Sequence, residues 1–297
     1  MLSRLAESFF WMGRYLERCE ATTRLLIEHH QLTVQQHTLD DAASGTFLTT
    51  LLALDANSST PADLIASVYG SESDPSTILG TLAATRNNAR AIRDAIPGDL
   101  YEALNSAYFA GINEVPNPGL PGTVLRAQIH RLAIINGILE WIAPRDSSYD
   151  FLQLGRSLER LDLTARLIAA GYDRTWPDQG PVTMLRSVDA LGAFVRGQIP
   201  LDGPHVRTFL ISDRTFPRSI YFCCQTAEAA MRRLKDRDDH IFREIALLRS
   251  ELEFSNASSA ESDQISIVNR TVDVVVKTSL NVSNEFFRPV GSIIWSA

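Results

Sequence analysis

Apolar residues recur at helical spacing along almost the whole chain, and short segments rich in Pro, Gly, Asp and Ser separate these runs. Residues three and four positions apart share one face of a helix, so the pattern predicts a series of amphipathic helices. Prolines, glycines and N-capping residues set the expected helix ends. One predicted helix is a short segment that begins at Pro61. The others cover residues 3–38, 75–96, 100–113, 123–142, 150–172, 181–196, 204–212, 216–235, 238–254 and 261–287.

The last of these segments is the one in which a strand competes with a helix. Four valines between positions 272 and 276 favour a strand locally. The apolar residues of the whole segment nevertheless keep helical spacing, at Val268, Val272, Val275, Val282 and Phe286. No convincing alternating strand pair or Asn-Gly hairpin occurs elsewhere. We therefore predict an all-α fold, a helical bundle.

The same arginine–glutamate helix occurs twice in the chain. Gly13–Arg18 aligns with Gly155–Arg160 when the chain is shifted by 142 residues. Over thirteen aligned residues eight are identical, which is more than chance amphipathicity explains. The repeat predicts an internal duplication, in which a single domain, residues 1–297, consists of the halves 1–145 and 146–297.

In both copies apolar residues cover one arc of the helix and charged residues cover the opposite arc. The charged residues are Arg14, Glu17, Arg18, Glu20 and Arg24 in the first copy, and Arg156, Glu159, Arg160, Asp162 and Arg166 in the second. Arg14 and Arg18 are four residues apart, so their like charges require an acidic group between them. Glu17 is close enough to contribute one.

A weaker second repeat places Arg86 and Arg90 over Arg214 and Arg218, so that each half would add an Arg-x3-Arg segment to its arginine–glutamate helix. Two interpretations stay open. The arginines and carboxylates form an internal ion-pair network, or they form a fixed fork that recognises phosphate or carboxylate groups. In either case these arginines should be paired, because an isolated buried arginine is costly.

Composition narrows the class of protein. The 297 residues carry a net charge of −7, and such an acidic balance argues against binding to nucleic acid or to a membrane surface. Three cysteines fit a reducing compartment, and we find no targeting signal. The longest later apolar run, residues 132–143, is too short to span a bilayer. We expect a cytoplasmic protein.

Catalytic and metal-binding patterns are poorly represented. The six histidines show no His-Glu-x-x-His motif, and no phosphate-binding glycine loop or nucleophile elbow is present, so we expect neither a metal nor a cofactor. Cys223 and Cys224 lie on a segment dense in apolar residues, which predicts two small buried side chains. Glu17 and Glu159 would form an acid/base pair if the two copies face each other, although their arginine neighbours should hold both ionised.

Several segments in the same order resemble the alpha-E family, a bacterial all-helical domain. Trp11–Arg18 is similar to the opening motif of that family, and Phe151–Arg160 is similar to its second motif. Phe209–Asp213 and Phe216–Ser219 resemble later blocks, so the resemblance covers nearly the whole chain. Together these patterns make the candidate binding residues Arg14, Glu17, Arg18, Arg86, Arg90, Arg156, Glu159, Arg160, Asp213, Arg218 and Ser219.

The resemblance also implies a functional setting. Members of the family are typically encoded beside, or fused to, circularly permuted ATP-grasp proteins and transglutaminase-like cysteine peptidases, which implies peptide or amide-bond synthesis and processing. Our preferred hypothesis is a non-catalytic helical partner of such a ligase. The alternatives are an enzyme that uses Glu17 and Glu159 between the repeats, and a homodimeric scaffold.

Overall fold

The fold is known from a computed structural model that describes residues 3–35, 48, 51–52, 61–114, 121–175, 178–234, 243–254 and 261–287. Within these ranges every regular element is a helix, which confirms the predicted all-α class. The predicted end of the first helix at residue 38, and most of the loop between residues 116 and 122, lie outside the described residues.

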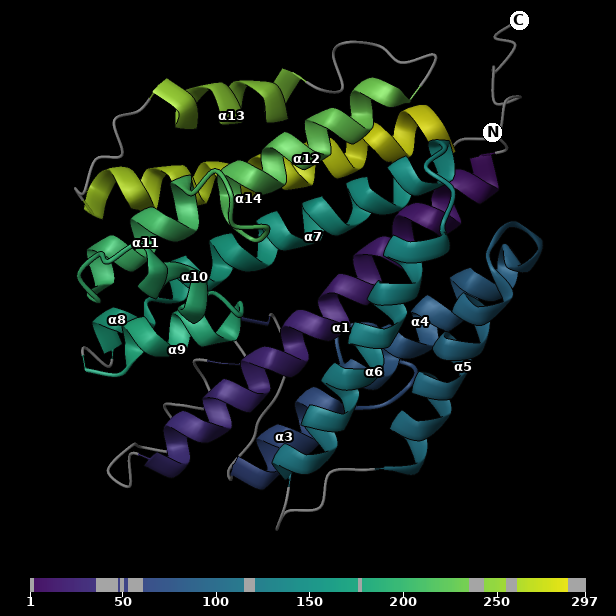
Figure 1. Cartoon of the computed structure of the whole chain (residues 1–297), viewed down its shortest axis with the longest axis horizontal. Coiled ribbons are helices and arrows are strands. Elements are labelled where there is room, and N and C mark those ends of the chain that lie inside the picture. Colours follow the sequence, from purple (N-terminus) through teal and green to yellow (C-terminus); the bar gives the residue numbers. More distant parts are fainter. Residues whose placement is uncertain are drawn as a thin grey trace, which may run out of the picture.

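The first long helix, α1 (Ser3–Gln35), is surrounded by the helices that follow it in the chain. These are α3 (Pro61–Tyr69), α4 (Ile78–Ala91), α5 (Gly98–Asn113) and α6 (Pro121–Ile142). α4 and α6 pack on α1, and α5 packs on both of them (Figure 1). Apolar side chains every three or four residues produce this packing, because each helix buries one stripe.

The second long helix, α7 (Ser147–Ala170), has a comparable set of neighbours. Asp146 caps its N-terminus by accepting from the backbone N–H of Ser148, and Gly171 ends it in the left-handed region at φ 71°. Packed around α7 are α11 (Gly203–Ser212), α12 (Ile220–Arg233), α14 (Glu261–Val282) and, on α12 and α14, α13 (Arg243–Phe254). Figure 1 shows α12 and α14 running alongside α7.

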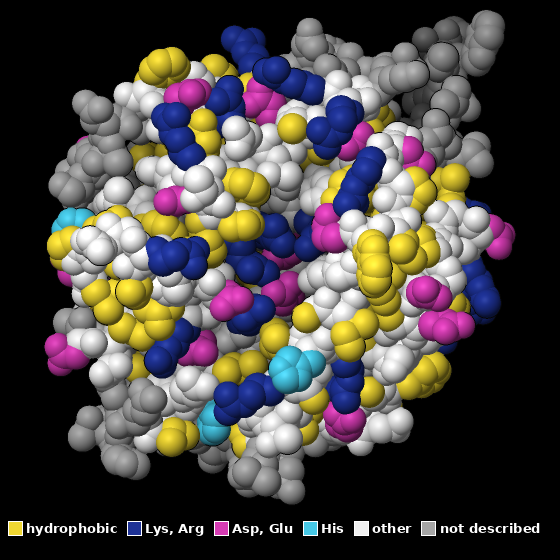
Figure 2. All heavy atoms as spheres, viewed as in Figure 1, with side chains coloured by type: hydrophobic (Ala, Val, Ile, Leu, Met, Phe, Trp, Pro, Cys, Tyr) yellow, Lys and Arg dark blue, Asp and Glu magenta, His cyan; other side chains and the backbone are white. Residues whose placement is uncertain are grey.

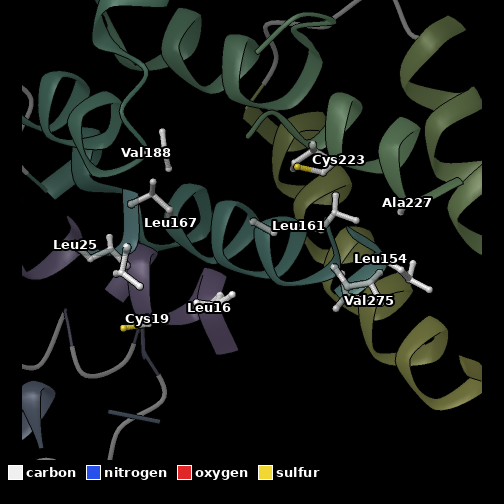
Figure 3. Close-up of a cluster of buried hydrophobic side chains, with 14 of the residues drawn as sticks. Leu16, Cys19, Leu25, Leu154, Leu161, Leu167, Val188, Cys223, Ala227 and Val275 are labelled. Atoms are coloured by element: carbon white, nitrogen blue, oxygen red, sulfur yellow. The ribbon is translucent and has the colours of Figure 1, made fainter. Parts of the chain in front are cut away.

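α1 and α7 pack against each other in the centre and join the two groups of helices. Their apolar arcs extend into a shared hydrophobic core (Figure 3). Leu16 and Leu25 of α1 contribute to it, and so do Leu161 and Leu167 of α7. Cys223 and Cys224 of α12 are buried in the same core, as the sequence predicts.

Three predicted helices have clearly different limits in the structure. The helix predicted over 75–96 covers only α4 (Ile78–Ala91) and is followed by a separate 3-10 turn, η1 (Arg93–Ala95). The segment predicted as one helix over 181–196 is broken into α9 (Gly180–Ser187) and α10 (Leu191–Arg196), because Asp189 adopts a left-handed conformation at φ 59°. The helix predicted from 216 begins only at Ile220, where Ser219 caps α12. A single-turn helix, α8 (Tyr172–Thr175), lies between α7 and α9.

The segment with the four valines is helical, so the prediction made from its spacing is confirmed. α14 continues into a π-helical turn, η3 (Ser283–Phe287), where Phe286 and Phe287 pack against the beginnings of the two long helices. The ring of Phe287 lies 5.4 Å from that of Phe10, and Phe286 lies 5.1 Å from Phe151. None of the described helices has the length and apolar character needed to cross a membrane.

Candidate functional site

α1 and α7 approach each other at two glycines. A Cβ atom on Gly13 would lie 2.2 Å from the carbonyl oxygen of Leu152, and one on Gly155 would lie 2.1 Å from that of Phe10. Both contacts are far below van der Waals distance, so only glycine permits this approach. We call two residues whose numbers differ by 142 paired positions. Gly13 and Gly155 are paired positions, and so are Phe10 and Leu152, so the contact is reciprocal.

The charged arcs of the two helices exchange partners across this crossing. Glu159 accepts hydrogen bonds from Arg14 Nε at 2.6 Å and from Arg18 Nε at 2.5 Å. Glu17 forms ion pairs with Arg160 Nε at 2.7 Å and with Arg156 Nε at 3.6 Å. Each glutamate is therefore held by the two arginines of the opposite helix. The acidic group between Arg14 and Arg18 is Glu159, and not Glu17 as the sequence suggested.

A third arginine joins only one of these two clusters. Arg218, in the loop before α12, places Nη2 2.6 Å from Glu20 Oε1 and Nε 3.5 Å from Glu17 Oε1. Arg24 Nε also donates to Glu20 at 3.1 Å. In the other cluster Asp162, the paired position of Glu20, accepts from Arg166 Nε at 3.0 Å. The two clusters thus differ in their number of cations.

The arginines determine the protonation of the buried glutamates. Burial by itself would raise the pKa of Glu17, but the charges of Arg160, Arg218 and Arg156 outweigh burial and lower it to about 2. The pKa of Glu159 is lowered in the same way, against burial, by Arg14 and Arg18. Both groups are carboxylates at neutral pH, which makes them anchors for cations and poor proton donors.

Two hollows lie beside the crossing, one at each cluster. The first, about 180 Å³, lies at the Glu159 cluster, and the second, about 20 Å³, lies at the Glu17 cluster beside Arg218. Figure 2 shows basic and acidic side chains gathered in a hollow near the middle of one face of the molecule. The residues around the first hollow are Arg18, Thr22, Leu51, Leu52, Ser76, Glu159, Asp162, Leu163 and Arg166.

Comparison with protein-family models identifies the family of this chain. Residues 1–287 match the model of Alpha-E, described as a predicted alpha-helical domain with a conserved ER motif. The chain belongs to the Alpha-E family. In one-letter code ER is Glu-Arg, which occurs here as Glu17-Arg18 and Glu159-Arg160. No curated protein and no solved structure matches the chain.

In this Alpha-E chain the ER motifs therefore lie at the helix crossing, where each glutamate is paired with arginines of the other motif. Other predicted residues have local roles. Asp213 accepts from the backbone N–H groups of Thr215 and Phe216, and Ser219 accepts from that of Phe222. These two residues shape the loop that presents Arg218.

Arg86 and Arg90 are not part of the Alpha-E crossing. The guanidinium of Arg86 donates to Asn105 Oδ1 at 2.6 Å and stacks on the ring of Tyr108, both on α5, and Arg90 is exposed on α4. The prediction that each half completes its cluster with an Arg-x3-Arg segment is therefore wrong for the first half. Arg86 lies inside a helix, whereas Arg218 lies in the loop before one.

The candidate list also missed residues that line the hollows, chiefly Thr22, Ser76 and Asp162. The repeat contained the signal for them, because extending the same shift of 142 residues places Ser76 opposite Arg218. The buried cysteines are thiols at neutral pH, since burial raises the pKa of Cys19 and of Cys223 to about 12. Among the described residues no group of three or more His, Cys, Asp or Glu forms that could hold a metal ion.

Proposed function

We propose that this chain is a non-catalytic helical partner of an ATP-grasp-type ligase, acting with it and a transglutaminase-like peptidase in peptide or amide-bond synthesis and processing. The observation that carries the non-catalytic part is the state of Glu17 and Glu159. Both are buried and held ionised by arginines of the opposite helix. Such carboxylates hold the two helices together and are poor proton donors, as expected of a binding protein.

An apolar stripe on α6 supports a protein partner. Ile134, Gly137, Ile138 and Trp141 follow one another at helical spacing, and the side chain of Trp141 is 87% exposed. Exposed aromatic residues within an apolar patch are typical of protein–protein contacts, where tryptophan contributes a large share of the binding energy. We therefore assign the ligase contact to this stripe of α6.

Co-purification with the ATP-grasp protein encoded beside this chain tests the proposal. We expect a stable complex at micromolar concentrations, and Trp141→Ala should weaken its affinity about tenfold. Phe254→Ala is the matched control, because Phe254 is 82% exposed but lies on α13. The absence of any complex at micromolar concentrations contradicts the proposal, and equal weakening by the two variants contradicts the assignment to α6.

The competing enzyme hypothesis is tested separately with Glu17→Gln and Glu159→Gln. If either variant keeps its fold but loses the function of the system while still binding the ligase, the non-catalytic interpretation fails. Light scattering addresses the homodimeric scaffold, which would show twice the mass of one chain in the absence of the ligase.

A further inference from the structure

The larger hollow, at the Glu159 cluster, resembles a binding site from which one side chain is missing. It lies beside Ser76, whereas the small hollow lies beside Arg218. Ser76 and Arg218 are paired positions. Their polar surroundings are paired as well: Thr22 with Thr164, Glu159 with Glu17, and Asp162 with Glu20. The two places can therefore be compared residue by residue.

The loops that carry Ser76 and Arg218 have matching conformations. Each residue directly precedes the N-cap of a helix, Thr77 for α4 and Ser219 for α12. Each cap hydroxyl accepts from the backbone N–H three residues later and donates to the carbonyl six residues earlier. The same hydrogen bonds in both loops direct Ser76 and Arg218 into corresponding places beside the crossing.

The side chains at these two positions differ in reach. Arg218 extends to Glu20 and Glu17 and largely fills its hollow, leaving about 20 Å³. The hydroxyl of Ser76 ends at its own loop, where it donates to Asp74 Oδ1 at 2.5 Å. About 180 Å³ stays open in front of it, space for several heavy atoms.

Polar groups around this space lack a partner that the other site has. Thr22 is 1% exposed, and its Oγ1 has no hydrogen-bond partner among the described residues, whereas Thr164 Oγ1 donates to the backbone carbonyl of Arg218 at 3.0 Å. The Thr22 hydroxyl is therefore free to accept a hydrogen bond from a ligand in this space. Asp162 is paired with one arginine of the described chain, but Glu20 is paired with two. The open site therefore has one arginine fewer than the other site.

We infer that this pocket, which we call the Ser76 pocket, binds a guanidinium group in the place that Arg218 occupies at the other cluster. The carboxylates of Asp162 and Glu159 supply the negative charge, and Leu51 and Leu52 contact the aliphatic part of the ligand. Arg18 and Arg166 also line the pocket, but their Nε groups already donate to these two carboxylates. The comparison with the other cluster, where the guanidinium of Arg218 holds the corresponding place beside Glu20, thus points to a guanidinium as the ligand.

The guanidinium can come from a free arginine-like molecule or from an arginine side chain of a peptide. Calorimetric titration of the full chain with methylguanidine and with N-acetylarginine amide distinguishes these sources. Titration with inorganic phosphate tests whether the pocket binds an anion instead. We expect one site for the two guanidinium compounds. Equal affinity for both would show that the pocket recognises the guanidinium group alone. Tighter binding of the amide would indicate an arginine side chain of a peptide as the ligand. Binding of phosphate in preference to methylguanidine overturns the inference.

Substitutions at the paired positions give the decisive result. Ser76→Arg inserts the side chain that the pocket lacks and should abolish binding of methylguanidine. Ser73→Arg, which adds the same charge at an exposed position of the same loop, should leave binding unchanged. Binding to Ser76→Arg with the affinity of the natural chain overturns the inference, and so does equal loss in both variants.

Two further variants keep the test decisive if Ser76→Arg does not fold. Asp162→Asn removes one carboxylate and should weaken methylguanidine binding tenfold or more, since a hydrogen bond to a charged group is lost. Arg218→Ser empties the second site, so the variant should bind two methylguanidine molecules and regain thermal stability as the ligand is added. A single site in Arg218→Ser, together with unchanged affinity in Asp162→Asn, contradicts the assignment. The inference does not rest on the proposed ligase partner.

Discussion

At the scale of single residues, the centre of the molecule combines close backbone packing with buried charge. Gly13 and Gly155 allow α1 and α7 to approach until a carbonyl of one helix lies where a Cβ of the other would be. The approach brings Glu17 and Glu159 within reach of arginines on the opposite helix. Adding a methyl group at either glycine, or neutralising either glutamate, should therefore disturb the contact between α1 and α7.

Gly155→Ala should destabilise the protein by about 1–3 kcal/mol or more, because the added methyl group meets the carbonyl of Phe10 and forces the helices apart. Urea unfolding followed by circular dichroism measures this loss. Gly137→Ala is the control, since nothing lies within 4 Å of its Cβ position on α6, and there alanine should stabilise by up to about 1 kcal/mol. An unchanged free energy of unfolding in Gly155→Ala would contradict the close approach of the two helices.

The lowered pKa of Glu17 predicts loss of stability in acid. Its value in the fold, about 2, lies below the ordinary 4.5, so ionised Glu17 stabilises the fold above pH 4.5. This contribution disappears as the pH falls from about 4.5 towards 2. The free energy of unfolding, measured in urea at a series of pH values, should fall over that range.

Glu17→Gln should already be less stable at neutral pH, by about 3–5 kcal/mol, because it leaves buried arginines without their carboxylate. Its stability should also change less between pH 4.5 and 2 than that of the natural chain. An identical pH dependence in the two proteins would show that Glu17 is not held ionised by the fold.

At the scale of elements, the order of helices follows the sequence pattern, but three helix limits depend on local backbone conformation. Thr77 and Ser219 begin α4 and α12 as caps, and Asp189 separates α9 from α10. The apolar spacing continues through residues 181–196, so periodicity alone cannot reveal a break caused by one left-handed residue. Caps and left-handed residues thus decide where each periodic segment is helical.

Gln198 offers a test at this scale. It follows the end of α10 (Leu191–Arg196) and has φ 52°, a conformation that glycine adopts without steric cost. Gln198→Gly should therefore raise the free energy of unfolding by up to about 1 kcal/mol. Gln198→Val should lower it by about 1–2 kcal/mol. Thermal and urea unfolding provide the measurement, and the opposite order of the two variants would contradict the left-handed conformation.

At the scale of the whole molecule, the two groups of helices share one centre. Each buried glutamate belongs to one long helix and its arginines belong to the other, so neither group alone satisfies its own charges. The exchange of partners is a structural observation, while the origin of the two halves by duplication stays a prediction.

This sharing predicts a single cooperative unfolding transition. Circular dichroism and tryptophan fluorescence should report the same midpoint in urea, because separating α1 from α7 leaves buried charges unpaired in both groups. Two resolved transitions, one for each group of helices, would contradict the shared centre.

Much of this organisation follows from the sequence alone. The period of apolar residues determines an all-α fold because a helix must bury one stripe, and the repeated Gly-Arg-x-Leu-Glu-Arg segment identifies both long helices and their charged arcs. The sequence also indicates that the arginines must be paired, since unpaired buried arginine is costly.

Only the tertiary structure decides which groups form the pairs. Ion pairing depends on distances between helices that are more than a hundred residues apart in the chain, and periodicity carries no information on such distances. The structure therefore assigns Glu159 to Arg14 and Arg18, excludes Arg86 from the cluster and includes Arg218. It also shows that a serine in place of an arginine leaves the Ser76 pocket open, because a cavity exists only where packed side chains fail to meet.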